Sequence, residues 1–524
     1  MKFLRRHKIL SFLFVVLLLV VSVILYRMKG PYRSYRIDLV KPAPDGIAQP
    51  GMLEVGVAKR DITPDLSQYD TWTDIDGDGA FRPDKGDTYE DRNHNGTFDL
   101  VWIAGFDENR PAQGVHDPLW VRAIAFRNNG VTVAMVTIDS IGILEEPYIR
   151  IRKSLDPALK IDHVMFSCTH THEGPDTTGI WSYSLLRPRF DAAYMALVER
   201  ACKQAVEEAV RTAQPAVMHL TSTRLEPGAY SNDTRKPLVY DETLCLARFI
   251  KPDTDETIAT MMSWGNHPEC LEGKNLLISS DFVHYLREGV EQGLSDPDGV
   301  PGLGGICLFF QGMLGGLMTP MHMKVTARNG VDTFETASFE KAQALGEALA
   351  LRTVKALRDP RVMHVDNPVV ALAAKTVYVP VSGTFRIPIM LGLIHPGWHW
   401  GEIRTEINAF RVGDLDVLTL PGEIYPEIAD GGIESPAGAD FGILPAETPP
   451  LRSRMRGKVN MVIGLANDQL GYIIPRSQWD TKPPYAYDGK PQYGEVNSGG
   501  PAIASTLHRE SLLLLERLHH AAPN

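Results

Sequence analysis

The stretch Val164-Met165-Phe166-Ser167-Cys168-Thr169-His170-Thr171-His172 decides most about the fold and chemistry of this chain. Residues 164–168 are mostly apolar and predict a buried strand, and the two histidines follow where that strand passes into a loop. Because residues two apart on an extended backbone point the same way, both imidazoles face one side. A neutral imidazole nitrogen is a preferred zinc ligand. The pair therefore predicts one or two ligands to a single metal ion, while two ordinary polar loop residues would show the same pattern.

Regular patterns elsewhere predict the fold class. The run 131–138 is typical of a buried strand, and 412–420 indicates a hairpin. Amphipathic helical periodicity marks 192–210 and 338–357. Alternating strands and helices predict an α/β fold, one large domain of mixed β-sheets flanked by helices over residues 51–524. No internal repeat and no linker are evident within that stretch.

The composition is that of an ordinary globular protein. The chain has 524 residues, 44% hydrophobic and 22% charged, and its formal net charge is −11. An acidic chain whose body lacks a lysine or arginine cluster is not expected to bind nucleic acid. Its five cysteines are odd in number and form no C-x-x-C pair. A disulfide framework and a cysteine-bound zinc are therefore not expected as the basis of the fold.

The N-terminus differs from the rest of the chain. Basic residues precede an apolar run over 9–26, and about eighteen helical residues span about 27 Å, close to the thickness of a hydrocarbon core. Residues 1–30 therefore predict a transmembrane signal anchor, with the body on the extracytoplasmic side, periplasmic or extracellular. A cleaved signal peptide is the alternative and would also export the body. The proline-rich residues 31–50 are expected to form a tether.

Two acidic loops stand out within residues 70–100. Both follow the pattern D-x-[DN]-x-[DN]-G, which presents side-chain oxygens at positions 1, 3 and 5 and a glycine at position 6. Hard oxygen ligands favour Ca²⁺, but position 12 is Lys85 or Trp102, not the glutamate of an EF-hand. The loops predict an inserted structural calcium site, with a solvated acidic loop as the alternative. The candidate ligands are Asp74, Asp76, Asp78, Asp91, Asn93, Asn95 and Asp99.

Further histidines and carboxylates stand in separate blocks downstream. These blocks are Asn266-His267-Pro268, Ser280-Asp281, Gln311 to Pro320, Pro421-Gly422-Glu423 and Asn467-Asp468-Gln469-Leu470-Gly471-Tyr472. Each block alone is weak evidence, because a buried His or Glu near a Gly-Pro turn is more often a structural hydrogen-bonding group than a ligand.

Taken in order, the blocks resemble the catalytic domain of the neutral (non-lysosomal) ceramidases and their bacterial relatives. The resemblance begins at residues 55–64, ending in Asp61-Ile62-Thr63-Pro64, continues through His116-Asp117-Pro118, and is most specific in the T-H-T-H-x-G-P block at 169–175. It extends from about residue 52 to a helix near 507–518, interrupted by the acidic loops. It implies a mixed α/β domain that holds one zinc ion and cleaves an N-acyl amide of the ceramide type.

The same resemblance implies a zinc site. Carried over residue by residue, the ligands are His170, His267, Glu423 and Tyr472. Relatives usually show two tyrosines three apart after the asparagine, and here Gln469 takes the first place, so Gln469 or water is the alternative fourth ligand. Two neutral imidazoles and one carboxylate leave room for a water whose pKa zinc lowers toward 7.

Other residues are candidates for steps around the metal. The resemblance places His172 beside the substrate, and His172 or Arg187 would stabilise an oxyanion. Asp281 or Glu173 would orient ligands or carry a proton to a leaving amine.

The block at 311–320 departs from the ceramidases. Their N/A-G-D-x-S-P-like block has an essential serine, whereas here the aspartate is missing and Thr319 stands in the serine's place. The departure keeps three functions open. The first is an exported, membrane-anchored zinc amidohydrolase that releases a fatty acid and an amine from a ceramide-type lipid. The others are a zinc esterase or deacylase acting on another lipid or an envelope glycan, and a non-catalytic, calcium-dependent envelope binding protein.

Overall fold

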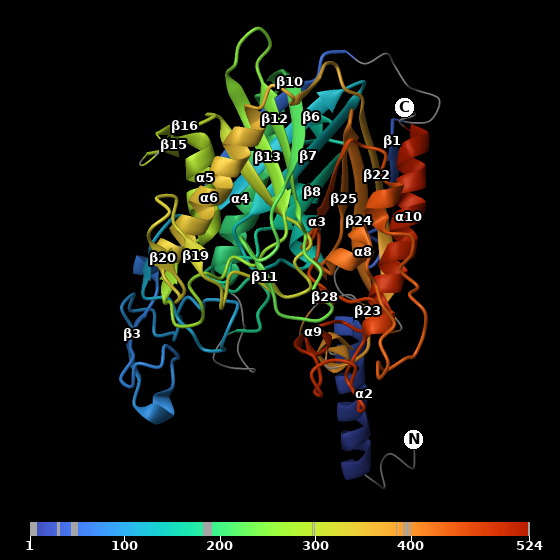
Figure 1. The fold of residues 1–524 in the computed structure, drawn as a ribbon. Helices are drawn as coiled ribbons and strands as arrows, with labels where there is room; N and C mark the ends of the chain where they lie inside the picture. The colour runs from blue at the N-terminus through green and yellow to red at the C-terminus, as the bar shows by residue number, and fades with distance from the viewer. Residues whose placement is uncertain are drawn as a thin grey trace.

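Three larger β-sheets of one design build the body of the protein (Figure 1). The first sheet has the order β8 (His163–Cys168), β7 (Val131–Ile138), β6 (Trp120–Asn128), β2 (Glu54–Asp61), β9 (Gln214–Pro215). The second has the order β17 (Ile306–Gln311), β13 (Thr257–Trp264), β12 (Thr243–Ile250), β10 (Val217–Arg224), β21 (Met363–Val365). The third has the order β27 (Val459–Ile463), β25 (Leu415–Thr419), β24 (Glu402–Val412), β22 (Val370–Pro380), β1 (Asp38–Lys41), with β23 (Trp398–His399) on β24.

The three sheets repeat the same strand directions. In each, the first two strands of the order are parallel and the later neighbours are antiparallel. The last strand of each sheet comes from the chain that leads into another sheet: β9 precedes the second sheet, β21 the third, and β1 the first. The chain therefore contains a structural repeat that its sequence does not show, closed into a ring by these exchanged strands.

The helices repeat as well. Each parallel pair is joined across a shorter helix: α3 (Glu145–Ser154), α5 (Phe282–Glu291) or α8 (Pro426–Asp430). A long helix then packs over the antiparallel strands of its own sheet: α4 (Ala192–Arg211), α6 (Phe339–Leu357) or α10 (Ile503–Ala521). Side chains cap the first two of these, since Asp191 accepts the amide of Ala193 and Ser338 that of Lys341. Figure 1 shows α5 and α6 on one flank and α10 on the other.

The inner faces of the three sheets share one core. Phe126 of β6 lies 5.3 Å, between ring centroids, from Phe249 of β12 and 5.4 Å from Phe410 of β24, so the middle strand of each sheet contributes one ring. All three side chains are fully buried, and burial of each stabilises the fold by about 2–3 kcal/mol. The shared core therefore fixes the three sheets relative to one another, and with them the strand ends at which the site forms.

The structure is a computed structural model that describes residues 8–28, 32–42, 51–181, 191–295, 297, 299–383, 385–390, 394, 398–399 and 401–521. The expected strand at 131–138 is β7, the hairpin is β24–β25, and the helices are α4, α6 and α10. The prediction of a mixed α/β fold is confirmed. The domain limits stay a prediction.

Short elements complete the fold. The strands are β3 (Thr71–Thr73), β4 (Thr88–Glu90), β5 (Gly114–Val115), β11 (Asn232–Asp233), β14 (Leu277–Ile278), β15 (Gly293–Leu294), β16 (Val300–Pro301), β18 (Met318–Thr319), β19 (Val325–Thr326), β20 (Thr333–Phe334), β26 (Glu423–Ile424) and β28 (Tyr472–Ile473). The helices are η1 (Leu66–Gln68), η2 (Pro83–Lys85), η3 (Pro157–Leu159), α7 (Arg386–Met390), η4 (Leu451–Arg454), η5 (Arg476–Gln478) and α9 (Tyr493–Val496). The acidic loops belong to the β3–β4 insertion, which has a small core of its own around Trp72, Phe81 and Leu100.

The structure bears on two expectations for the N-terminus. The apolar segment forms helix α2 (Lys8–Met28), but among the described residues no helix has the length and apolarity to cross a membrane, so a transmembrane helix within 1–30 is not supported. The expected tether, 31–50, lies partly outside the described residues. Within it β1 pairs with β22, because Leu39 packs on the shared core.

Candidate metal centre and its cavity

Three candidate ligands meet at one end of the three sheets. His170 follows β8, His267 follows β13, and Glu423 begins β26 just after β25. Each of these strands is a member of the parallel pair of its sheet. Carboxyl ends of strands joined by crossovers are the usual place for a binding site in mixed α/β folds. Each sheet therefore supplies one group to a common centre.

The distances within this group fit a tetrahedral metal site. Glu423 Oε2 lies 3.6 Å from His170 Nε2 and 3.3 Å from His267 Nε2. Zinc bonds to imidazole and carboxylate are about 2.0–2.2 Å long, so two ligand atoms at corners of one tetrahedron lie about 3.3–3.6 Å apart. The side chains therefore enclose a position of the size that zinc requires.

The orientation of both imidazoles is set by backbone carbonyls. His170 Nδ1 hydrogen-bonds the carbonyl of Ile141 at 2.5 Å, and His267 Nδ1 that of Met318 at 2.7 Å. A carbonyl only accepts, so each Nδ1 carries the proton and each Nε2 keeps a free lone pair toward Glu423. His170 also has a positive φ of 67°, a strained conformation that is often found at functional sites.

Glu423 is prepared to stay ionised. Burial alone would raise its pKa, but His170 and His267 hold the pKa of this carboxyl well below its ordinary value. Oε2 has no hydrogen-bond partner among the described residues. A buried carboxylate oxygen without a partner is costly, by about 1–3 kcal/mol or more, and a cation between the two imidazoles would satisfy it.

Tyr472 and Gln469 take different places at this centre. The Tyr472 hydroxyl lies 3.5 Å from His267 Nε2, and β28 pairs in parallel with β26 so that Tyr472 stands opposite Glu423. Gln469 Nε2 instead donates to the other carboxylate oxygen, Glu423 Oε1, at 3.4 Å. The geometry therefore favours Tyr472 as fourth ligand and gives Gln469 a separate contact.

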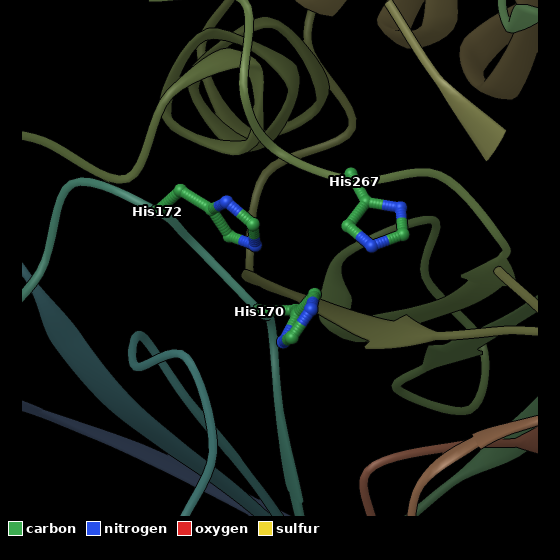
Figure 2. A group of neighbouring side chains, drawn as sticks. All are labelled: His170, His172 and His267. Carbon is green, nitrogen blue, oxygen red and sulfur yellow. The ribbon is translucent and has the colours of Figure 1, made fainter. Parts of the chain in front are cut away.

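His172 lies beside the two candidate ligand histidines, His170 and His267 (Figure 2). Its ring centroid is 4.8 Å from that of His170 and 5.6 Å from that of His267, and the three rings have ligand atoms within 4.8 Å of one another. Burial, followed by the two neighbouring imidazoles, lowers the pKa of His172 well below its ordinary value. Its ring is therefore neutral at neutral pH.

Glu269 is a residue that sequence reasoning missed. Its Oε2 lies 3.3 Å from His172 Nδ1, yet without hydrogen-bond geometry, since neither nitrogen of His172 has a partner in the described part of the chain. Thr319 hydrogen-bonds the carboxyl group of Glu269, and burial raises the pKa of that group. The available signal was its place two residues after His267.

The other catalytic candidates lie apart from the cavity or outside the described residues. Asp281 caps α5, accepting the amides of Phe282 at 2.6 Å and Leu271 at 3.2 Å. Thr319 in β18 reaches the centre only through Glu269. Arg187 is outside the described residues. Sequence position alone could not separate these roles, because a helix cap and a proton carrier are both buried carboxylates.

Glu173 is also held away from the cavity. Arg110 Nη1 lies 3.4 Å from its carboxylate, and Asn275 Nδ2 donates to it at 2.8 Å. Burial raises the pKa of Glu173 to about 8. These contacts hold the loop that carries the histidines, since Arg110 also donates to the carbonyl of His172.

A cavity of about 160 Å³ opens over the centre. Its polar lining includes His170, His172, Glu423, Gln469 and Tyr472. Most other lining side chains are apolar: Ile141, Leu144, Ile180, Trp181, Phe385, Ile389, Ile394, Ile403 and Leu470. An apolar chamber with a few convergent polar groups suits a substrate that has a hydrocarbon chain attached to one polar bond.

The acidic loops have a different geometry. Asp74, Asp76 and Asp78 place one oxygen each within 4.8 Å of one another, but Lys85 Nζ lies 3.0 Å from Asp76 and 2.6 Å from Asp78. In the second loop Asp91, Asn93 and Asn95 accept backbone amides, and Asp99 accepts the side-chain amide of Asn95 at 2.8 Å. The loop shape is the expected one, whereas calcium binding stays a prediction.

Comparison with known proteins agrees with this architecture. No protein-family model matches the chain. Over 241 residues it is 26% identical to neutral ceramidase A of Dictyostelium discoideum, covering 41% of this chain and 33% of that protein. The chain thus aligns with about a third of the length of this curated relative.

Solved structures extend the likeness over most of the body. The neutral ceramidase of Pseudomonas aeruginosa matches with a TM-score of 0.62 at 16% identity, covering 90% of this chain and 75% of that chain. A ceramidase complexed with C2 matches with a TM-score of 0.61 at 16% identity, covering 89% and 76%. The resemblance to neutral ceramidases that the sequence motifs indicate is confirmed.

Proposed function

We propose that this relative of the neutral ceramidases is a zinc-dependent hydrolase that cleaves the N-acyl amide bond of a ceramide-type lipid into a fatty acid and an amine. The observation that carries the proposal is the convergence of His170 Nε2 and His267 Nε2 on Glu423 Oε2, at 3.6 Å and 3.3 Å, beneath an apolar cavity. The names of the matched proteins support the choice of substrate class.

The donor set fits zinc in number, kind and geometry. His170, His267, Glu423 and Tyr472 would hold the ion, two imidazoles and a carboxylate being a common catalytic zinc set. When bound, zinc polarises a carbonyl and makes hydroxide available from water near neutral pH. The orphaned, ionised Glu423 oxygen is the observation on this chain that such an ion accounts for.

The protein's own side chains would bind the substrate and stabilise the charge that develops on its carbonyl oxygen. The apolar wall, with Ile141, Ile180 and Trp181 among its residues, would hold the acyl chain and exclude water. His172 stays neutral and has one ring N–H to donate to the carbonyl oxygen as negative charge develops there. Glu269 contacts the other side of that ring and would position it.

The test is hydrolysis of a fluorescent short-chain ceramide by the purified chain, with metal analysis of the same sample. We expect turnover that a zinc chelator abolishes and that His170→Ala lacks. A matched ester substrate runs in parallel, because turnover of the ester alone would contradict an amidohydrolase and support an esterase. The control variant is His364→Ala, an exposed histidine in β21.

Calcium binding by the insertion is a separate proposal. We propose that Asp74, Asp76 and Asp78 in the first loop, and Asp91 with its neighbours in the second, bind Ca²⁺ in a structural role, because both keep the turn geometry of D-x-[DN]-x-[DN]-G loops. Isothermal titration with Ca²⁺ tests this, and the absence of binding at millimolar Ca²⁺ would contradict it.

The place of action is also a proposal. Basic residues precede helix α2, and the side chains of Leu10 and Phe12 on it are 64% and 67% exposed. We propose that this segment directs export and that the body works on the periplasmic or extracellular side. Fractionation of cells that express the full chain, or the chain without residues 1–30, tests this. Recovery of the full chain in the cytosol would contradict it.

A further inference from the structure

The two polar atoms of the Gln469 side-chain amide have different surroundings. Its Nε2 donates to Glu423 Oε1 at 3.4 Å, while its Oε1 is buried and has no hydrogen-bond partner within the described residues. The assignment of the two atoms follows from chemistry, because an ionised carboxylate only accepts hydrogen bonds and must therefore face the NH₂ end. Gln469 also lines the cavity, so an unpaired acceptor stands in the wall of the chamber.

The side chain of Gln469 packs against the loop that contains Gly142. A Cβ on Gly142 would lie 3.0 Å from Gln469 Cγ and 3.3 Å from Cδ, so a side chain at position 142 would press against the glutamine and shift it. The loop itself is held by Thr177, whose hydroxyl donates to the carbonyl of Gly142 at 2.6 Å. The neighbouring carbonyl, that of Ile141, orients His170. One loop therefore positions both a metal-site histidine and the unpaired acceptor.

Gln469 contacts the carboxylate oxygen of Glu423 that does not face the histidines. Glu423 Oε2 faces His170 and His267, whereas Oε1 faces Gln469. A trans secondary amide directs its N–H away from its carbonyl oxygen. A substrate whose carbonyl oxygen turns toward the imidazoles would therefore turn its N–H away from them. Gln469 Oε1, in a residue of the cavity wall, is an acceptor without a partner among the described residues.

We propose that Gln469 is the residue that recognises the substrate N–H and so makes this site selective for secondary amides over esters and N-alkylated amides. This inference rests on the proposed function and deepens it by naming the group that reads the scissile bond. A site that has a buried acceptor rejects a ligand lacking the donor, because the acceptor then stays unpaired and desolvated. Gln469 is a specificity residue and needs no proton transfer for this role.

The experiment compares three ligands of equal chain length: a short-chain N-acyl amide, its N-methyl derivative and the corresponding ester. Binding to chelator-treated protein is measured by isothermal titration calorimetry, and kcat/KM is measured on the zinc-loaded protein. The variants are Gln469→Met, which keeps the volume without the acceptor, and Gly142→Ala, which displaces the side chain while leaving Gln469 present. Gln343→Met, on the exposed face of α6, is the matched control.

We expect the unaltered protein to prefer the N–H amide by about 10- to 100-fold, and both cavity variants to lose that preference because kcat/KM falls more for the N–H amide than for the ester. Equal losses for all three ligands, or a loss of zinc, would overturn the inference and reduce Gln469 to a support for Glu423. The same holds if the unaltered protein shows no preference. Selective binding of the N–H amide without hydrolysis would contradict the proposed function but support the role of Gln469. Hydrolysis without selectivity for the N–H amide would support the proposed function but contradict the role of Gln469.

Discussion

The two clusters that could hold a cation differ in what already satisfies their donor atoms. His170, His172 and His267 are buried, and the nitrogens of His172 and Oε2 of Glu423 have no partner in the described structure. Around the exposed acidic loop, Lys85 and Arg82 form ion pairs with Asp78, at 2.6 Å and 2.8 Å.

The difference predicts which of the two clusters would be stabilised more by a bound ion. Burial makes each unpaired polar atom cost about 1–3 kcal/mol, whereas exposed carboxylates are solvated and their ion pairs contribute about 0–1 kcal/mol. We therefore expect loss of the metal to change activity at the buried centre and to have only local effects at the loop.

The largest expected effect is the removal of one buried ligand. His267→Ala should abolish stoichiometric zinc binding and lower kcat/KM by about a thousandfold or more, because the remaining groups cannot hold the ion. Metal analysis and ceramide hydrolysis check this. Asp76→Ala in the acidic loop is the counterpart and should leave zinc and turnover unchanged; a comparable loss there would break the distinction between the clusters.

The next effect concerns a buried carboxylate that has no place in the cavity. Glu406 of β24 forms a two-point ion pair with Arg152 of α3, at 2.6 and 2.8 Å, and lies 2.9 Å from His163 of β8, so it joins the first and third sheets. Glu406→Gln leaves the Arg152 charge short of its partner and should lower the free energy of unfolding by about 3 kcal/mol. Equilibrium urea unfolding measures this, and zinc content should stay at the unaltered level.

The same carboxylate predicts a dependence of stability on pH. Burial would raise its pKa, but Arg152 and His163 hold it at about 2, below the ordinary value of 4.5. A lowered pKa in the folded state stabilises the protein above pH 4.5, and that contribution is lost as pH falls from about 4.5 toward 2. The Glu406→Gln variant should show a shallower loss of stability over this range; an identical slope would contradict the assignment.

A smaller effect is expected at Glu269, which acts only through His172. Glu269→Gln keeps the size of the side chain but weakens its hold on the ring, so kcat should fall by about 10- to 100-fold with zinc content unchanged. Steady-state kinetics with parallel metal analysis check this. Loss of zinc in this variant would show that Glu269 supports the metal site itself.

The smallest effect belongs to the exposed loop. Lys85→Ala removes the ammonium group beside Asp76 and Asp78 and should tighten Ca²⁺ binding, while the free energy of unfolding changes by less than about 1 kcal/mol. Calcium titration and urea unfolding measure the two effects. Unchanged Ca²⁺ affinity would show that the cation does not use this loop.

The sequence predicts what depends on local pattern. The apolar run of β7 and the periodicity of α4 and α6 indicate those elements because burial on one face leaves a direct trace along the chain. The threefold design leaves no such trace. Phe126, Phe249 and Phe410 occupy matching strands of the three sheets. Because another large apolar side chain could fill such a position, the repeat is visible in the strand topology and not in the amino-acid sequence.

The site shows the same limit. Motif order places His170, His267 and Glu423 in one centre before any coordinates are known, because the resemblance carries their roles. The contacts of Gln469 and Glu269 depend on how separate loops approach one another, and no spacing in the chain encodes that. Asp281 caps α5 in the structure, a contact that its place near the motif does not indicate.

The most direct test of the account is an anomalous difference map measured at the zinc absorption edge from crystals of the purified protein. The account predicts a single strong peak enclosed by His170 Nε2, His267 Nε2 and Glu423 Oε2, with bonds of about 2.0–2.2 Å. No peak there in crystals grown with zinc, or a peak only at Asp74, Asp76 and Asp78, would contradict it.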